Sequence, residues 1–251
     1  MKNQNLYNYI LGIADNSLIL GQRLGELCGH GPNLETDIAL TNISLDLLGQ
    51  TRSYYQYAAS VAGDDRTEDD IAFLRLERAY KNVLLVEQPN DHFGFIMGRQ
   101  FLFDMYHAML MEALQNSPDE TLAAIAKKGI KEVSYHLRFS SDWVKRLGDG
   151  TQESHEKMQE AIDGLWKFTD ELFHTTEADL AMIEAEVGVD VRTFRDSYYK
   201  KVGEVLTEAT LIIPESKYFQ KGGKEGIHSE HMGYLLSDLQ YMQRTYPNMK
   251  W

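Results

Sequence analysis

The sequence predicts an all-α protein, a helical bundle made of long helices. Only five prolines occur in 251 residues, and all of them fall between segments with helical apolar spacing. Because proline breaks the interior of a helix, the long stretches between the prolines are free to be helical. Those stretches repeat apolar residues every three or four positions, and no alternating segment of useful length stands out. Long helices, short polar loops and no strands are typical of a helical bundle.

The expected helices follow the intervals between these breaks. Segment 40–59 repeats apolar residues around a helix, and segment 93–111 is apolar almost all round, which predicts a helix buried on most sides. NVLLVE at 82–87 is the best strand candidate, but it continues a helical pattern and is predicted as helix. The predicted helices lie near residues 5–29, 35–62, 67–86, 92–115, 119–147, 151–174, 190–210 and 228–246.

The expected domain organisation is a single helical domain over residues 1–251. One loose segment is expected at about 214–228, before the last helix, because it carries three glycines in five residues. The single cysteine, Cys28, excludes an internal disulfide and a cysteine zinc site, and is predicted to be a small buried apolar residue.

The charge balance limits the classes of partner. The net charge of -13 argues against nucleic acid or an anionic membrane as the main partner, because both attract lysine and arginine. No apolar run approaches the roughly 20 residues that span a bilayer. No basic segment followed by an apolar run opens the chain, so a cytoplasmic location is expected.

Acids and histidines inside the apolar helices allow a comparison with ferritin-like carboxylate proteins. Those proteins bind two metal ions with a Glu from each of two helices and a Glu-x-x-His from each of two others. The corresponding positions here depart from that pattern, since a glycine and a tyrosine stand where histidines are wanted and one histidine follows at i+4. The positions compared are Glu26, Asp46, Gly49, Asp104, His107, Glu132, Tyr135 and His136.

Three interpretations of these residues stay open from the pattern alone. They form a dinuclear metal site, or a single-metal site made by Asp104, His107, Glu132 and His136. Alternatively they form a polar seam in which the acids pair with the histidines or with nearby cations, since buried charges need partners. The candidate cations are Arg23, Arg52, Lys131 and Arg138.

Four blocks, in order and spread over nearly the whole chain, resemble one known family. They are GELCGHGP at 25–32, LLVEQPN at 84–90, YHLRFS at 135–140 and GGK-x-G-x-H-x-E-H at 222–231. Together they are similar to the non-catalytic C subunits of bacterial phenylacetyl-CoA 1,2-epoxidases. The resemblance implies a ferritin-like four-helix bundle core with additional helices and no metal or other cofactor in this chain.

The same resemblance implies a multicomponent monooxygenase of aerobic phenylacetate catabolism. A paralogous A subunit would carry the di-iron centre, and a reductase subunit with flavin, an iron-sulfur cluster and NADPH would supply electrons. This chain would pair with the A subunit, keep it folded and active, and contribute acyl-CoA contacts near the A–C boundary. Lys81 would neutralise a CoA phosphate and Tyr80 would stack on adenine. The implied contact residues are Ala79, Tyr80, Lys81, Asn82, Leu180, Ala181 and Met182.

Three classes of function therefore remain to be separated. The first is a structural subunit, and the second is an active oxidoreductase with an atypical carboxylate-histidine metal site. The third is an acyl-CoA-binding module that acts alone. The QKGGKEG stretch lacks P-loop spacing and is predicted to be a flexible loop that faces a partner.

Permanent complexes bury large apolar surfaces, so aromatic stretches with no evident core role are candidate interfaces. We expect the isolated chain to self-associate or to be less stable than its complex. The candidate interface residues are Tyr54, Tyr55, Tyr57, Tyr241, Met242, Tyr246 and Trp251.

Overall fold

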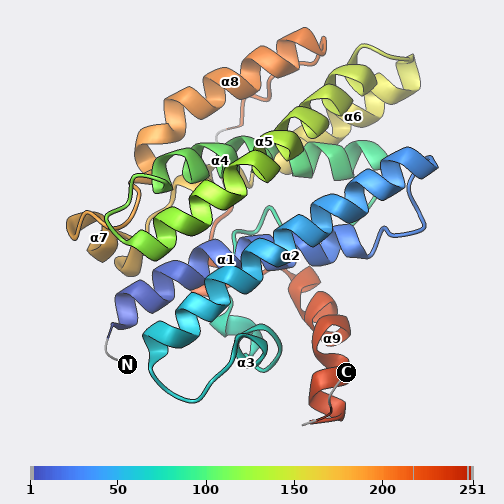
Figure 1. The fold of residues 1–251 in the computed structure, drawn as a ribbon. Helices are drawn as coiled ribbons and strands as arrows, with labels where there is room; N and C mark the ends of the chain where they lie inside the picture. Colours follow the sequence, from blue (N-terminus) through green and yellow to red (C-terminus); the bar gives the residue numbers. More distant parts are fainter. Residues whose placement is uncertain (1–2, 217, 248, 250–251) are drawn as a thin grey trace. The chain divides into compact units, whose positions relative to one another are not determined.

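The computed structural model describes residues 3–216, 218–247 and 249, and the regular secondary structure of these residues is entirely helical, with no strand among them (Figure 1). The all-α prediction is confirmed. Four short 3-10 turns accompany the helices at Glu77–Ala79, Asp170–Phe173, Val191–Phe194 and Gly223–Glu225. The α-helices are α1 Gln4–Gly25, α2 Leu34–Ala62, α3 Glu68–Phe73, α4 Phe93–Leu114, α5 Glu120–Gly148, α6 Gln152–Trp166, α7 Glu177–Glu184, α8 Arg195–Glu208 and α9 Glu230–Thr245.

The chain forms two compact units. The first unit comprises the described parts of Met1–Pro89, Thr176–Met182 and Gly222–Trp251, and the second comprises Asn90–Thr175 and Ile183–Lys221 with the same restriction. Each unit is built around one pair of long helices. The expectation of a single domain stays a prediction.

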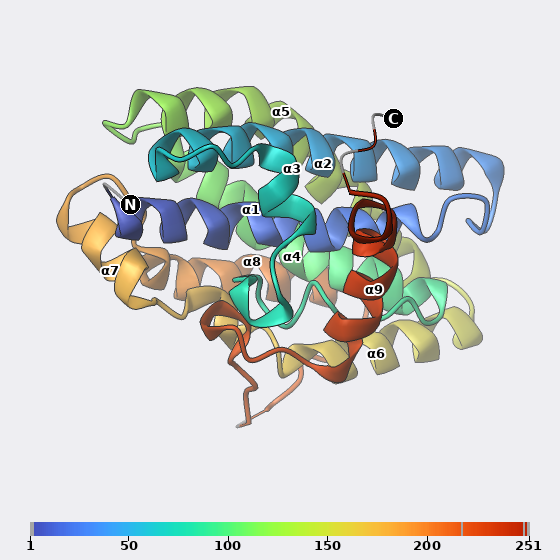
Figure 2. The same ribbon diagram turned by 90° about the horizontal axis from the view of Figure 1, so that it is seen from below.

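The first unit is built on α1 and α2, which lie side by side and antiparallel (Figures 1 and 2). Each begins at an asparagine whose side chain accepts a backbone N–H of the first turn, Asn3 for α1 and Asn33 for α2. The helices approach closely at Gly21, whose carbonyl accepts the Ser44 hydroxyl at 2.7 Å. Cys28 lies in the turn after α1 and is exposed, so the prediction that it is buried is wrong.

Residues 80–88 form a non-helical strap, buried from Asn82 to Gln88, where the sequence predicts the end of a helix. The α-helix that begins at Glu68 ends at Phe73, so the predicted helix 67–86 is wrong beyond that point. The strap is stable without helical hydrogen bonds because side chains of α1 accept hydrogen bonds from its backbone N–H groups. Asp15 Oδ2 accepts Lys81 N at 2.7 Å, and Asn16 Oδ1 accepts Val83 N at 2.8 Å.

The glycine-rich segment 222–226 packs directly on this strap. A Cβ on Gly223 would lie 2.2 Å from the Asn82 carbonyl oxygen, and one on Gly226, whose φ is +81°, would lie 2.2 Å from that of Arg78. Gly222, Gly223, Lys224 and Gly226 are buried. The prediction of a loose, partner-facing loop is therefore wrong for 222–226. The glycines there allow two backbone segments to approach closely and do not make the segment mobile.

Gly223→Ala is expected to destabilise the protein by about 1–3 kcal/mol, since the new methyl group forces two backbone segments apart. The matched control is Gly49→Ala in α2, where a Cβ would meet nothing within 4 Å. This control is expected to be neutral or to stabilise by up to about 1 kcal/mol through helix propensity. Urea unfolding of both variants measures the difference, and a Gly223→Ala variant as stable as Gly49→Ala would contradict this packing.

The second unit packs α5, α6 and α8 around α4. As predicted, α4 is buried on most sides. Tyr198 of α8 donates its hydroxyl to the Leu102 carbonyl at 2.9 Å, which satisfies the one polar atom of a fully buried ring. The predicted helix 151–174 ends earlier, at Trp166, and continues only as the 3-10 turn Asp170–Phe173.

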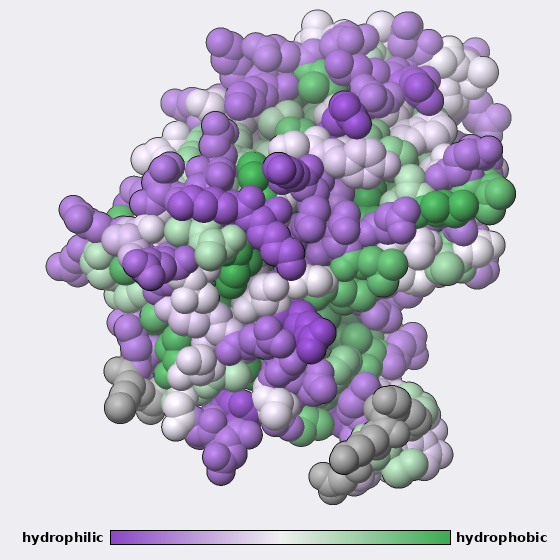
Figure 3. Space-filling model, viewed as in Figure 1, coloured by the Kyte–Doolittle hydropathy of each residue, from purple (hydrophilic) through white to green (hydrophobic). Residues whose placement is uncertain are grey.

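Polar residues cover most of the face shown in Figure 3, and hydrophobic residues form smaller separate patches. Exposed apolar side chains include Leu34, Ile38 and Leu45 of α2. Within the described part of the chain, no helix is long and apolar enough to cross a membrane.

The predicted interface residues divide into three groups. Tyr54 and Tyr55 are buried in the core, so their assignment to an interface is wrong. Tyr57 is half-buried. Tyr241, Met242 and Tyr246 are exposed on or just after α9, and Trp251 lies outside the described residues.

Candidate functional site

A buried polar cluster in the second unit contains three of the compared metal-site positions. Asp104 and His107 of α4 and His136 of α5 are almost completely buried. Asp104 accepts the Gln100 amide at 2.7 Å through Oδ1, and its Oδ2 lies 2.8 Å from the Ser140 hydroxyl. The expected pairing of this acid with a cation or a histidine is wrong, because its hydrogen-bond partners are neutral.

Burial raises the pKa of Asp104 to about 8, although the hydrogen bonds from Ser140 and Gln100 oppose the shift. The acid is therefore predominantly protonated at neutral pH. Ser140 Oγ donates to Asp104 Oδ2 and also lies 3.0 Å from the His136 carbonyl. The Ser140 hydroxyl is thus within hydrogen-bond distance of two acceptors, Asp104 Oδ2 and the His136 carbonyl.

His107 is also kept neutral. Burial, and to a smaller extent the charge of His136, lower its pKa to about 3. Neither ring nitrogen has a hydrogen-bond partner among the described residues, and the ring packs 5.2 Å from that of Phe103. A buried imidazole without partners costs free energy, so this residue weakens the folded state.

His107→Met is expected to raise the free energy of unfolding, and the gain should be larger in acid. The depressed pKa of the folded state means that wild type loses stability as the pH falls from about 6.5 toward 3. At pH 4 the advantage of the variant over wild type should exceed its advantage at pH 7 by roughly 3 kcal/mol. Urea unfolding at both pH values, with the exposed His30→Met as control, checks this. An advantage that does not change with pH would contradict the neutral buried imidazole.

The other compared positions carry no complete ligand set. Glu26 caps the end of α1 and pairs with Arg23 at 3.1 Å, which confirms one predicted ion pair. Gly49 is exposed and has no side chain to offer, Asp46 and Glu132 are half-buried, and Tyr135 is 39% exposed.

A di-iron centre, which the ferritin-like comparison suggests, does not fit these residues. Both carboxylate oxygens of Asp104 already accept hydrogen bonds, from Gln100 and Ser140, and Gly49 has no side chain that could ligate a metal. No group of three or more His, Cys, Asp or Glu residues suited to a metal occurs in the described part of the chain. The single-metal site of Asp104, His107, Glu132 and His136 is likewise not assembled.

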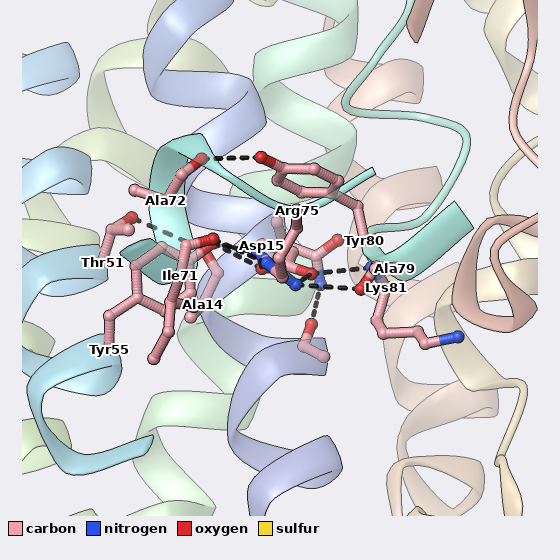
Figure 4. Close-up of polar contacts among 12 residues, drawn as sticks. Ala14, Asp15, Thr51, Tyr55, Ile71, Ala72, Arg75, Ala79, Tyr80 and Lys81 are labelled. Carbon is pink, nitrogen blue, oxygen red and sulfur yellow. Dashed lines mark hydrogen bonds and ion pairs between the residues drawn. The ribbon is translucent and has the colours of Figure 1, made fainter. Parts of the chain in front are cut away.

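A second buried network, in the first unit, has Asp15 of α1 at its centre (Figure 4). Its carboxylate is fully buried and binds Arg75 at 2.6 and 3.0 Å. Tyr55 of α2 donates to it at 2.5 Å, and the Lys81 amide donates to it from the strap. Arg75 also covers the Tyr80 ring, with its guanidinium carbon 4.1 Å from the centroid. This network fixes the start of the strap between α1 and α2.

The predicted acyl-CoA contact residues differ in how accessible they are in this arrangement. Tyr80 and Asn82 are fully buried. Tyr80 donates its hydroxyl to the Ala72 carbonyl and lies under Arg75, so it is not free to stack on adenine. Lys81 is half-buried, and its side chain points away from the network (Figure 4). Leu180 is exposed in α7.

A cavity of about 260 Å³ in the first unit includes Lys81 of the first predicted segment, whereas Leu180, Ala181 and Met182 of the second are not among its lining residues. Lys81 lines it from the strap, and the α7 end lines it with Thr176, Glu177, Ala178 and Asp179. The sequence pattern does not reveal its other lining residues, which are Asn8, Gly12, Lys224 and Glu225. Only the spatial meeting of α1, the strap and the glycine-rich segment identifies them.

Paired long helices with a degenerate set of acids and histidines define the class: a helical-bundle protein related to the ferritin-like carboxylate proteins, with an incomplete ligand set. The family model described as phenylacetic acid catabolic protein matches residues 1–251. The chain belongs to this family. It is 50% identical over 243 residues to the C subunit of 1,2-phenylacetyl-CoA epoxidase from Escherichia coli strain K12, and the match covers 97% of this chain and 98% of that protein.

Proposed function

We propose that this chain is a non-catalytic structural subunit of a multicomponent phenylacetyl-CoA 1,2-epoxidase in aerobic phenylacetate catabolism. The observation that carries the proposal is the state of the would-be ligand helices. Both carboxylate oxygens of the buried Asp104 accept hydrogen bonds from neutral side chains, and Gly49 stands at a position where a histidine ligand is wanted. The similarity to the C subunit of an epoxidase over nearly the whole chain supports the same role.

The proposed partner is a catalytic A subunit that carries the di-iron centre. A reductase subunit with flavin, an iron-sulfur cluster and NADPH supplies its electrons. The role of this chain is to hold the A subunit in an active fold. Exposed apolar residues such as Leu34 and Ile38 of α2, or Tyr241 of α9, offer surface that a permanent partner would bury.

The chain also contributes to acyl-CoA binding, through the cavity between the strap and α7. Lys81 supplies a positive charge at this cavity and makes no ion pair within the described part of the chain, while the other charged lining residues are Lys224, Glu177, Asp179 and Glu225. A cation of this kind is suited to a CoA phosphate. Because acyl-CoA thioesters are intracellular metabolites, we also propose a cytoplasmic location.

Reconstitution tests this function. The catalytic A subunit and the reductase, supplied with NADPH, O2 and phenylacetyl-CoA, are assayed with and without this chain. We expect epoxide formation to need this chain, and the two subunits to co-purify. Equal turnover without the chain would refute the structural role. Saturable tight binding of phenylacetyl-CoA to the isolated chain would instead favour a binding module that acts alone.

The isolated chain is expected to self-associate, or to unfold at a lower temperature than the complex. Sedimentation and thermal unfolding, with and without the A subunit, measure both properties. A monodisperse monomer whose unfolding temperature does not rise on complex formation would contradict this expectation.

A further inference from the structure

The cavity of the first unit contains two lysines with different electrostatic surroundings. Lys81 is half-buried and has no carboxylate partner within the described residues. Lys224 is 8% exposed and its ammonium lies 2.8 Å from Asp179 Oδ2, so its charge is already neutralised. The charge of Lys81 can therefore attract an anionic ligand, whereas the charge of Lys224 is already compensated by Asp179.

One end of the Lys224–Asp179 pair is anchored in the first turn of α7. Asp179 Oδ2 also accepts the Thr176 backbone N–H at 2.8 Å, and the Asp179 N–H donates to the Thr176 hydroxyl at 3.2 Å. This reciprocal arrangement is a capping box, which fixes where the helix begins. Whatever holds Asp179 in place therefore also positions residues 180–182 that follow.

The other end is anchored on the strap. Lys224 follows Gly223, and a Cβ at Gly223 would lie 2.2 Å from the Asn82 carbonyl oxygen. Further along, His228 lies 3.1 Å from the Tyr80 carbonyl and 2.9 Å from the Glu87 carboxylate. The segment that carries Lys224 thus stays in register with residues 79–82.

We propose that Lys224 is a positioning residue that fastens the start of α7 to the strap and so sets the separation of the two acyl-CoA-contacting segments. The proposal rests on the proposed function. Lys81 binds the anionic group of the ligand, and Lys224 maintains the shape of the cavity that binds it.

Substitution of Lys224 and substitution of Lys81 are therefore expected to change phenylacetyl-CoA binding in different ways. Lys224→Met leaves Asp179 without its cation and frees the first turn of α7, and displacement of a binding group by about 1 Å can cost up to 100-fold. We expect an affinity loss of about tenfold for phenylacetyl-CoA. Since Lys81 remains, affinity should still fall as salt increases. Lys81→Met should also weaken binding and should flatten that salt dependence, because it removes the unpaired charge.

The test measures the dissociation constant of phenylacetyl-CoA for the complete complex with the A subunit, at low and high salt. The variants are Lys224→Met, Lys224→Arg and Lys81→Met, and Lys157→Met is the control. Lys157 forms an exposed pair with Glu153 in the second unit. Lys224→Arg restores a cation for Asp179 and is expected to recover most of the affinity. Asp179→Asn breaks the pair from the other side and replaces Lys224→Met if that variant does not fold.

Two results would overturn the inference. One is wild-type affinity in Lys224→Met, or in Asp179→Asn if it replaces that variant. The other is a flattened salt dependence in Lys224→Met, which would make this lysine a direct ligand of the anion. Failure of the wild-type complex to bind or turn over phenylacetyl-CoA is a different outcome, because it refutes the proposed function itself.

Discussion

Arg75→Met is expected to lower the free energy of unfolding by about 3–5 kcal/mol, the usual cost of removing one partner of a buried ion pair. Among the described residues, the substitution leaves the fully buried Asp15 carboxylate with only the Tyr55 hydroxyl and the Lys81 amide. It also uncovers the Tyr80 ring. Urea unfolding measures the loss.

Two further variants separate the buried pair from a general loss of arginine. Arg192→Met removes an exposed pair with Asp190 and should leave the free energy of unfolding almost unchanged, because exposed ion pairs contribute little. Asp15→Asn combined with Arg75→Met should cost less than the sum of the single substitutions, because no unpaired charge remains. Losses that simply add would contradict the coupling.

Asp104→Asn is expected to stabilise the protein at neutral pH, by roughly 4 kcal/mol at pH 7. The folded-state pKa of about 8 lies above the ordinary value of 3.8. The contribution of the protonated acid is therefore fully present below about pH 4 and is lost as the pH rises toward 8. Asparagine has the same shape without an ionisable group, and its amide oxygen can still accept from Gln100. The gain should vanish near pH 4.

The matched control is Asp163→Asn on α6. Asp163 is exposed and accepts a glutamine four residues earlier, Gln159, at 3.0 Å, as Asp104 accepts Gln100. This control should change stability little at any pH. Urea unfolding from pH 4 to 8 checks both variants. Destabilisation by Asp104→Asn at pH 7 would show that the native acid is ionised and paired.

The sequence predicts the long helices well because each buries a face large enough to impose a regular apolar period. The same reasoning fails at 82–87, where a buried apolar run has helical spacing but the backbone of the strap is bonded to Asp15 and Asn16 of α1. Those bonds join residues more than 60 positions apart. A local sequence pattern carries no information about such long-range hydrogen bonds.

At the candidate site, too, some features can be predicted from the sequence and others cannot. The absence of a full ligand pattern is readable from Gly49 and Tyr135, because it depends only on residue type and helical register. The raised pKa of Asp104 is not readable from the sequence, because it comes from complete burial, which outweighs the opposing hydrogen bonds from Ser140 and Gln100. Lys224 is also hidden in the sequence, since its role depends on glycines that seat its segment against the strap.

Iron content tests the central claim most directly. The purified chain is incubated with excess ferrous iron under air, alone and with the A subunit, and bound iron is counted per chain after gel filtration. We predict far less than one iron per chain for the isolated protein, and a dinuclear centre in the complex that is assigned to the A subunit. One or two tightly bound irons in the isolated chain, lost in an Asp104→Asn variant, would contradict the claim that this chain leaves the metal chemistry to its partner.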